Sequence, residues 1–232
     1  MSFFPLAVII PAFDEEEGIE YTIIELKRAV KPVSVIVVDG KSRDRTVEIA
    51  KGLGADVIIQ KGKGKGSAVY EGLTYINCNV AYVALIDADY TYPAVHFKKM
   101  IEILDQNHKI GMVLGNRFNR IYALESMKDQ FYVGNRIMAF VHRLCNGVNL
   151  NDPLTGVRII RCDLLRGWKP DSKGFDIEIE LNCHVKRMGY DIVEVPIKYR
   201  PRLGKKKLGF RHGLAILNRI LLDSNVPRYA GT

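Results

Sequence analysis

Four short runs of apolar, β-branched residues in the first half of the chain alternate with segments of helical periodicity. The runs cover residues 6–10, 33–38, 55–59 and 81–86, and none follows a strict alternation of apolar and polar positions. Continuous apolar strands of this length are typical of parallel sheets that are buried on both faces. Strands and helices that alternate at this spacing predict an α/β fold with a doubly wound, mostly parallel sheet flanked by helices.

The second half of the chain continues the pattern less regularly. In order, we predict a strand at 110–115, an amphipathic helix at about 127–145, a strand at 157–161, a helix at 177–188 and a strand at 190–197. No linker, internal repeat or low-complexity segment divides the chain. We therefore expect residues 1–232 to form a single domain.

The composition is that of a globular protein, with 47% apolar and 26% charged residues. The longest apolar runs fall well short of the ~20 residues that a membrane-spanning helix needs. The four cysteines form no C-x-x-C pair, and the N-terminus carries no basic segment followed by a long apolar one. We therefore expect reduced thiols, no zinc site and a cytoplasmic protein. The formal net charge of +8 indicates a polyanionic partner, which could be nucleic acid, a phosphorylated metabolite or an anionic membrane surface.

Polar segments follow each of the four predicted strands of the first half. They are Pro11-Ala-Phe-Asp-Glu15, Asp39-Gly-Lys-Ser42, residues 61–66 and Asp87-Ala-Asp89. In open α/β sheets, ligands bind beyond the carboxyl ends of the strands. The first half is therefore predicted to be a platform for a nucleotide.

Asp87-Ala-Asp89 follows directly on a predicted buried strand. Two carboxylates at a strand end offer hard oxygen ligands for Mg²⁺ or Mn²⁺, and substrate phosphates usually complete the coordination of such ions. The alternative is that this segment only caps the helix that Pro93 opens. The position at a strand end favours the metal site.

Two further segments are candidates for nucleotide binding. Residues 61–67 alternate lysine with glycine before a predicted helix, which is typical of an anion site built from backbone N–H groups, although a flexible basic loop is the alternative. Asp39 lies at a strand end, where its carboxylate could accept a hydrogen bond from a nucleobase N–H. Helix capping is the alternative for Asp39, but Ser42 and Asp44 are better placed to cap a helix from Thr46 onwards.

The C-terminal part combines a basic segment with an apolar helical stripe. Residues 198–207 contain no acid, and Arg211 continues the charge. Apolar residues then recur with helical spacing from Phe210 to Leu221. Such a helix either lies on an anionic lipid surface or packs on the domain, and periodicity alone does not separate the two.

Taken together, these motifs resemble the family 2 glycosyltransferases, and the similarity extends from about Ala7 to Leu208. The segment 11–16 is similar to the P-A-[YF]-N-E-E opening of that family, with Asp14 in the usual Asn position. The segment 37–46 is similar to V-V-D-D-G-S-x-D-x-T and keeps Asp39 in the base-binding place, while glycine and lysine replace the second Asp and the Gly.

Gly64-Lys65-Gly66 and Asp87-Ala-Asp89 match the G-K-G element and the D-A-D metal motif of the same family. Four further motifs are similar to those of dolichol- and polyprenyl-phosphate sugar synthases within that family. They are Leu114-Gly-Asn-Arg117 for V-G-S-R, Asp152-Pro-Leu-Thr-Gly156 for D-P-x-S-G, Glu194-Val-Pro196 for E-V-P, and Arg202-Leu-Gly-Lys-Lys-Lys207-Leu208 for R-x-G-x-S-K-L. Thr91 stands where some members carry a metal-holding Gln, and Lys206 replaces the Ser of the last motif.

The resemblance implies a Rossmann-like, A-type glycosyltransferase fold with a C-terminal amphipathic helix. Residues 1–115 would form the nucleotide-sugar half, residues 116–208 the acceptor half and residues 209–232 an amphipathic tail. The reaction would be the inverting transfer of a hexose from GDP-mannose or a UDP-hexose to dolichyl or polyprenyl phosphate. The enzyme would act on the cytoplasmic face of a membrane, bound peripherally or through a membrane-anchoring partner subunit.

The resemblance and the residue chemistry together assign candidate site residues. Those expected to bind the nucleotide sugar are Pro11, Phe13, Asp14, Glu15, Asp39, Lys65, Gly66, Asp87, Ala88 and Asp89. Asp87 and Asp89 are the expected ligands of Mg²⁺ or Mn²⁺. The expected catalytic residues are Asp89, Arg117, Arg136, Asp152, Arg202 and Lys207, and the basic ones among them would bind donor and acceptor phosphates.

Two alternatives remain at this point. A family 2 enzyme with a soluble hydroxyl acceptor would need a carboxylate base, for which Asp152 and Asp176 are the candidates. A phosphate acceptor needs no base, because with a second pKa of about 6 it is largely dianionic at neutral pH. A non-enzymatic nucleic-acid-binding protein would exploit the net charge, but the acidic strand ends would repel a phosphate backbone.

Overall fold

The computed structural model describes residues 5–32, 34–76, 79–119, 132–205, 207 and 209–224. Seven strands in this part of the chain form one sheet in the order β3-β2-β1-β4-β6-β5-β7. The strands are β1 (Leu6–Ala12), β2 (Ser34–Asp39), β3 (Asp56–Ile59), β4 (Tyr82–Leu85), β5 (Ile110–Asn116), β6 (Arg158–Arg161) and β7 (Asp191–Pro196). Only β6 runs antiparallel to its neighbours β4 and β5, so the sheet is mostly parallel, as predicted.

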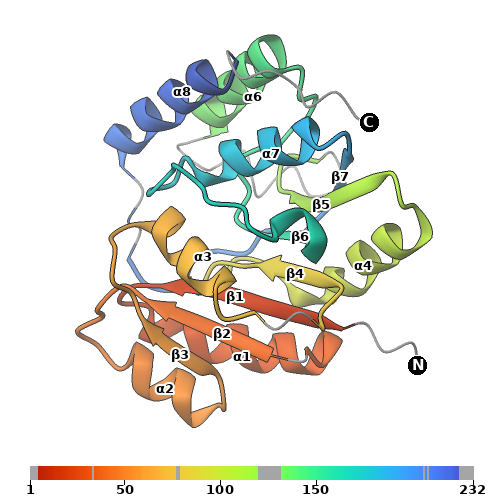
Figure 1. Cartoon of the computed structure of the whole chain (residues 1–232). Coiled ribbons are helices and arrows are strands. Elements are labelled where there is room, and N and C mark those ends of the chain that lie inside the picture. The colour runs from red at the N-terminus through yellow and green to blue at the C-terminus, as the bar shows by residue number, and fades with distance from the viewer. Residues whose placement is uncertain are drawn as a thin grey trace.

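Helices cover both faces of the sheet (Figure 1). The α-helices of the described residues are α1 (Glu16–Val30), α2 (Thr46–Gly52), α3 (Lys65–Leu73), α4 (Phe97–Gln106), α6 (Tyr132–Asn146), α7 (Ile177–Arg187) and α8 (Phe210–Ser224). Two 3₁₀-helices, η1 (Ala94–His96) and η2 (Cys162–Leu165), follow β4 and β6. The predicted doubly wound α/β architecture is confirmed.

The strands are apolar throughout because alternate side chains enter two different cores. In β1, Leu6, Val8 and Ile10 pack in the same core as the buried residues of α1 and α4. Their neighbours Ala7 and Ile9 pack on the other face, with α3 and α7. All five side chains are fully buried. This two-sided burial explains why the sequence shows continuous apolar runs instead of alternation.

Helices α6 and α8 form a further layer outside α7 (Figure 1). Ile216 and Ile220 of α8 pack against Ile179 and Cys183 of α7 in a separate small core. The C-terminal helix therefore packs on the domain through one side, which was one of the two readings left open by its periodicity. No helix in the described ranges is long and apolar enough to cross a membrane.

The first strand ends later in the structure than the sequence predicts. Strand β1 continues through Pro11 to Ala12, whereas the predicted strand ends at residue 10. The Ile9 carbonyl accepts a hydrogen bond from Ile86 on the β4 side, so the position of Pro11, two residues later, faces the same side beyond the end of β4. No ladder bond is lost there by the missing N–H. Residues 127–131 of the predicted amphipathic helix, Cys78 and the tail beyond 224 lie outside the described residues.

Gly66 at the start of α3 marks a close approach between two segments, and we expect Gly66→Ala to destabilise the fold. A Cβ there would overlap the carbonyl oxygen of Ser172, while the backbone N–H of Gly66 donates to the Gly174 carbonyl at 3.1 Å. Because the clash is with backbone, we expect the free energy of unfolding to fall by about 1–3 kcal/mol in urea titrations. Gly52→Ala, at a helical position with open space around it, should be neutral or stabilise by up to about 1 kcal/mol. Equal effects of the two substitutions would contradict this packing.

Candidate functional site

A cavity of about 620 Å³ lies along the carboxyl edge of the parallel strands. Its walls come from the ends of β1, β4 and β5 and from the segments that follow β2, β3 and β7. The structure brings Glu15, Asp87, Asp89 and Arg117 together in the lining of this cavity. The segments come from far apart in the sequence, and the parallel sheet brings them to one edge.

The Asp87-Ala-Asp89 segment is held in place by α1. Thr22 donates its hydroxyl to the Ala88 carbonyl at 3.2 Å and accepts the backbone N–H of Tyr90 at 3.1 Å. The backbone at Tyr90 is left-handed (φ 63°), which turns the chain immediately after the two carboxylates. A non-glycine residue in this conformation is strained, and such strain clusters at functional sites.

Asp87 is paired with a buried lysine. The Lys65 ammonium lies 2.6 Å from Asp87 Oδ1 and 2.6 Å from Glu178 Oε1 at the start of α7. On the other side, Asp87 lies against Gly156, where a Cβ would overlap its carboxylate. The predicted anion-binding lysine is thus engaged by two carboxylates. Glu178 was not predicted, because in the sequence it reads as an acidic residue in the first turn of a helix.

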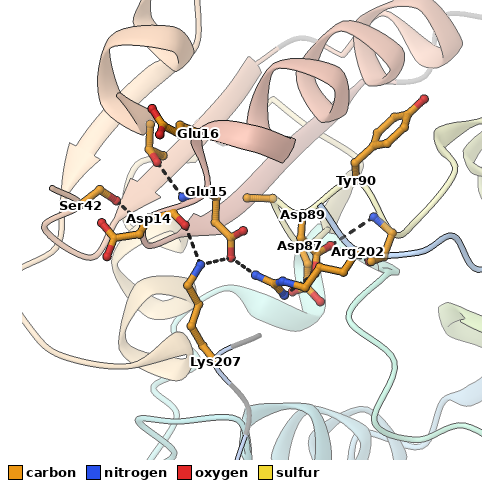
Figure 2. Close-up of polar contacts among 12 residues, drawn as sticks. Asp14, Glu15, Glu16, Ser42, Asp87, Asp89, Tyr90, Arg202 and Lys207 are labelled. Atoms are coloured by element: carbon orange, nitrogen blue, oxygen red, sulfur yellow. Dashed lines mark hydrogen bonds and ion pairs between the residues drawn. The ribbon is translucent and has the colours of Figure 1, made fainter. Parts of the chain in front are cut away.

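Asp89 is paired with the basic segment that follows β7 (Figure 2). Backbone hydrogen bonds from Arg200 to Thr91 (3.0 Å) and from Leu203 to Asp89 (3.2 Å) fix this segment beside the aspartates. The guanidinium of Arg202 lies between its two partners, 2.5 Å from Asp89 Oδ2 and also bonded to Glu15.

Two neighbours complete this cluster around Asp89 and Glu15. Lys207 contacts Glu15 Oε1 at 2.6 Å and donates to the Asp14 carbonyl at 2.8 Å (Figure 2). The Thr91 hydroxyl donates to Asp89 Oδ1 at 2.6 Å. Thr91 therefore orients the carboxylate of Asp89, at the position where some family members carry glutamine.

The two aspartates have opposite pKa shifts. Burial is the largest single influence on the pKa of Asp87 and would raise it, but the charge and hydrogen bond of Lys65, together with the charges of Arg202 and Arg117, lower it overall. Burial and the neighbouring charge of Asp87 raise the pKa of Asp89, and Arg202 opposes this rise. The pKa of Lys65 is raised in spite of its burial, because two carboxylates contact it. The site therefore holds buried negative charge that depends on cations for its stability.

Arg117 lines the cavity and forms a bidentate pair with Asp152. Its Nε and Nη2 lie 2.8 Å and 2.7 Å from the two oxygens of Asp152, which is fully buried. Glu194 accepts the backbone N–H groups of Asn151 and Asp152 and so fixes the loop that carries the aspartate. Asp152 therefore positions Arg117, and both of its oxygens are occupied.

Asp176, the other candidate for a catalytic base, is also engaged. Its carboxylate accepts the backbone N–H of Gly174 at 3.1 Å and lies 3.6 Å from Arg219.

Tyr92 was not predicted as a site residue. Its hydroxyl accepts the N–H of Gly156 at 2.7 Å, and its ring stacks edge-on against Tyr199 in the cavity wall. Nothing in the local sequence Tyr-Thr-Tyr-Pro indicates that the second tyrosine lines a cavity.

Asp39, which is predicted to bind the nucleobase, lies beside the cavity and not in its lining. Asp39 is buried, and its carboxylate accepts the N–H groups of Lys41 and Ser42 at 2.9 Å and the Ser42 hydroxyl at 2.5 Å. It is not among the residues that line the cavity, whereas Lys41 is. Asp44, two residues before α2, accepts the N–H of Thr46 at 3.0 Å. The base-binding role of Asp39 stays a prediction.

Some of the remaining predicted site residues line the cavity and others do not. Pro11, Phe13 and Ala88 line the cavity. Gly66 follows Lys65 but does not line the cavity, and its N–H donates to the Gly174 carbonyl. Asp14 is also outside the lining, and its side chain accepts the N–H of Arg43 at 2.7 Å. Arg136 is exposed on α6, outside the cavity lining, so the geometry does not bring it to the phosphates. Lys206 and Leu208 lie outside the described residues.

The chemistry of this donor set fits a divalent cation that takes part of its coordination from a substrate. Two carboxylates with hard oxygens, Asp87 and Asp89, face the same cavity, and both are paired with cationic side chains. No group of three or more acidic, histidine or cysteine side chains that could hold a metal occurs among the described residues. A cation bound here would need ligands from phosphate or water, as Mg²⁺ commonly does.

We expect Lys65→Met to destabilise the fold strongly, because it leaves Asp87 and Glu178 buried without their shared cation. Removing one partner of a buried ion pair costs about 3–5 kcal/mol, measured as the free energy of unfolding in urea. Adding Glu178→Gln to Lys65→Met should recover part of this loss, because only one unpaired carboxylate remains. If the double variant instead lost the sum of the two single effects, the shared pairing would be refuted.

Comparisons with known proteins agree with this site. Residues 7–167 match the family described as glycosyl transferase family 2. The chain is 33% identical to a dolichyl-phosphate hexose transferase of Haloferax volcanii, over 93% of this chain and 92% of that protein. It is 30% identical to an undecaprenyl-phosphate mannosyltransferase of Micrococcus luteus, over 90% of each chain.

Solved structures show the same fold. Glucosyl-3-phosphoglycerate synthase from Mycobacterium tuberculosis, crystallised with Mn²⁺, UDP and phosphoglyceric acid, superposes with a TM-score of 0.77. The alignment covers 97% of this chain and 80% of that one at 21% identity. A cavity with an Asp-x-Asp pair at the carboxyl edge of an A-type glycosyltransferase sheet, together with the sequence matches, leads to one conclusion. This chain belongs to glycosyl transferase family 2.

Proposed function

We propose that the protein transfers a hexose from a nucleotide diphosphate sugar to the phosphate of a dolichyl or polyprenyl lipid, with inversion at the sugar. The observation that carries this proposal is the arrangement of charge in one cavity. The buried Asp89 and the half-buried Asp87 lie at one wall, and Arg117, Arg202 and Lys207 line the same space. The relatives named as dolichyl-phosphate hexose transferase and undecaprenyl-phosphate mannosyltransferase support the choice of acceptor.

Asp87 and Asp89 are the residues that would hold Mg²⁺ or Mn²⁺ together with the donor diphosphate. A divalent cation there supplies Lewis-acid stabilisation of the negative charge that develops on the leaving nucleoside diphosphate. The neighbouring structure that contains Mn²⁺ and UDP supports a metal of this class. Thr91 and Thr22 keep Asp89 and its loop in one orientation, so little rearrangement is required of the carboxylates.

The basic side chains would bind the acceptor phosphate. Arg202 and Lys207 face the cavity, where they are paired with Glu15 and Asp89. Their positive charge would attract a phosphate that enters the cavity. Guanidinium groups bind phosphate with bidentate hydrogen bonds, and Arg117 is held for this by Asp152.

The geometry favours a phosphate acceptor over a hydroxyl acceptor. A hydroxyl must lose its proton to a base, but Asp152 is locked to Arg117 and Asp176 is engaged by Gly174 and Arg219. A lipid phosphate is already largely dianionic at neutral pH, so it requires cations in the site and no base.

Family membership also leaves no reason to retain the nucleic-acid-binding alternative. We place the reaction at the cytoplasmic face of a membrane, where a water-soluble donor meets a lipid acceptor.

A donor screen tests the proposal directly. Purified protein is incubated with a polyprenyl phosphate, Mn²⁺ or Mg²⁺ and a panel of radiolabelled UDP- and GDP-sugars. We expect labelled hexose in the organic phase for one nucleotide series, and none when the metal is chelated or the lipid is omitted. Transfer to a soluble hydroxyl compound with no product on any prenyl phosphate would contradict the proposal.

Arg202→Ala should raise the KM for the lipid phosphate about tenfold or more, since a hydrogen bond between charged groups contributes about 1.5–3 kcal/mol. Arg200→Ala is the matched control. Arg200 lies in the same segment, but its guanidinium pairs with Glu25 at 2.7 Å and stacks on Tyr90, outside the cavity lining. Steady-state kinetics at limiting acceptor should separate the two variants. An unchanged KM for Arg202→Ala would reject its assignment to the acceptor.

A further inference from the structure

Helix α6 is apolar on two opposite sides. Toward the body of the protein it presents partly buried residues such as Met138 and Val141, together with the buried Ala139. On the opposite side lie four apolar residues spaced four, three and four positions apart, which places them in one stripe along the helix. They are Val133, Ile137, Phe140 and Leu144, with exposed fractions of 66%, 55%, 62% and 67%. A helix of a globular protein normally carries polar residues on its outer side.

Helix α8 extends this apolar surface. Leu214, Leu221 and Leu222 are 59%, 49% and 52% exposed, on the side of the helix opposite to Ile216 and Ile220. The two helices pack against each other, and Asn146 of α6 donates to a main-chain carbonyl of α8 at 3.1 Å. Figure 1 shows α6 and α8 as the outermost layer of the molecule, beyond α7. We call the seven exposed residues of α6 and α8 the α6–α8 apolar surface.

The charges beside this surface have one sign. Arg136 and Arg143 on α6 and Arg211 on α8 are exposed. The sequence of α6 contains no aspartate or glutamate, and the single acid of α8, Asp223, is buried and paired with Arg187. An apolar helical surface flanked by arginines is complementary to the interface of a bilayer that contains anionic lipids.

The same two helices reach the cavity. Asn135 of α6 and Ile216 of α8 line it, on the far side from the carboxyl ends of β2 and β3. Lys207, which precedes α8 by three residues, contacts Glu15 inside the cavity. A surface in contact with lipid headgroups would therefore be continuous with the wall of the space in which an acceptor phosphate is proposed to bind.

We propose that the α6–α8 apolar surface docks onto an anionic lipid bilayer and that the phosphate of the lipid acceptor enters the cavity past Asn135 and Ile216. The inference rests on the proposed function, because a lipid acceptor gives the surface its partner. A second copy of the chain is a poorer occupant. A two-fold interface places the same residues of both copies close together, so the arginines of α6 would repel one another.

Vesicle flotation tests the docking surface with the intact chain. Wild-type protein should float with vesicles of phosphatidylcholine and phosphatidylglycerol at low salt, and less with phosphatidylcholine alone. The double variant Ile137→Glu/Phe140→Glu should bind the anionic vesicles about tenfold more weakly or worse, because it removes two apolar contacts and adds charge of the wrong sign. Both side chains are exposed, so the fold should be unaffected, which circular dichroism and thermal unfolding check.

The matched control is Tyr75→Glu. Tyr75 is 60% exposed, close to the 62% of Phe140, but it follows α3 at the opposite edge of the sheet from the cavity. This variant should float like the wild type. The proposal is overturned if the Ile137→Glu/Phe140→Glu variant floats as well as Tyr75→Glu, or if the wild type does not bind bare anionic vesicles. It is also overturned if sedimentation shows a wild-type dimer that the double variant dissociates, since a second copy would then cover the surface.

Activity measurements separate this inference from the proposed function. With a water-soluble, short-chain prenyl phosphate and no vesicles, the double variant should transfer hexose like the wild type. With a long-chain carrier embedded in anionic vesicles, it should lose about the same factor as in flotation. Equal loss on both acceptors would overturn the docking role. If the wild type transferred hexose to neither acceptor, the proposed function would be refuted. The flotation assay would still show whether the α6–α8 apolar surface binds anionic vesicles.

Discussion

The neutralisation of buried carboxylates by basic side chains is the interaction on which the site depends. Glu15, Asp87, Asp89 and Glu178 gather at the carboxyl edge of the sheet, and each is less than one third exposed. Such charges are stable out of water only when they are paired. Lys65, Arg202 and Lys207 supply the pairing, and they come from α3 and from the segment after β7. The pairing thereby joins the first and last parts of the described chain around one cavity.

This arrangement accounts for both halves of the proposed chemistry. The carboxylates form a site suited to a divalent cation and a diphosphate, and the cations opposite them suit a second phosphate. Helix α7 connects the site to the outer layer. Its Glu178 pairs with Lys65 at the cavity, while Ile179 and Cys183, further along the helix, pack against α8. The layer that carries the α6–α8 apolar surface is thus fixed to the site by a rigid element.

Much of the fold could be predicted from the sequence, because burial on both faces leaves a direct signature in β1, β2 and β4. The Asp87–Asp89 pair could also be predicted, because its position after a buried strand follows from the same pattern. Residues that become neighbours only through the tertiary structure could not be predicted from the sequence. Glu178 and Tyr92 carry no local signal. The sequence predicts an amphipathic helix around α6, but only the packing of that helix shows which of its apolar residues stay exposed. Arg136 was predicted to bind phosphate because it is basic and lies in the acceptor half of the chain, yet it is outside the cavity lining.

The proposed chemistry requires Asp89 to hold a divalent cation together with a nucleoside diphosphate. Calorimetric titration of Mn²⁺ into the protein, with and without saturating UDP or GDP, measures this binding. We expect Mn²⁺ to bind more tightly when the correct nucleoside diphosphate is present, and Asp89→Asn to lower that affinity by about tenfold or more while the protein stays folded. Equal Mn²⁺ affinity in Asp89→Asn and the wild type, with nucleotide bound, would contradict the account.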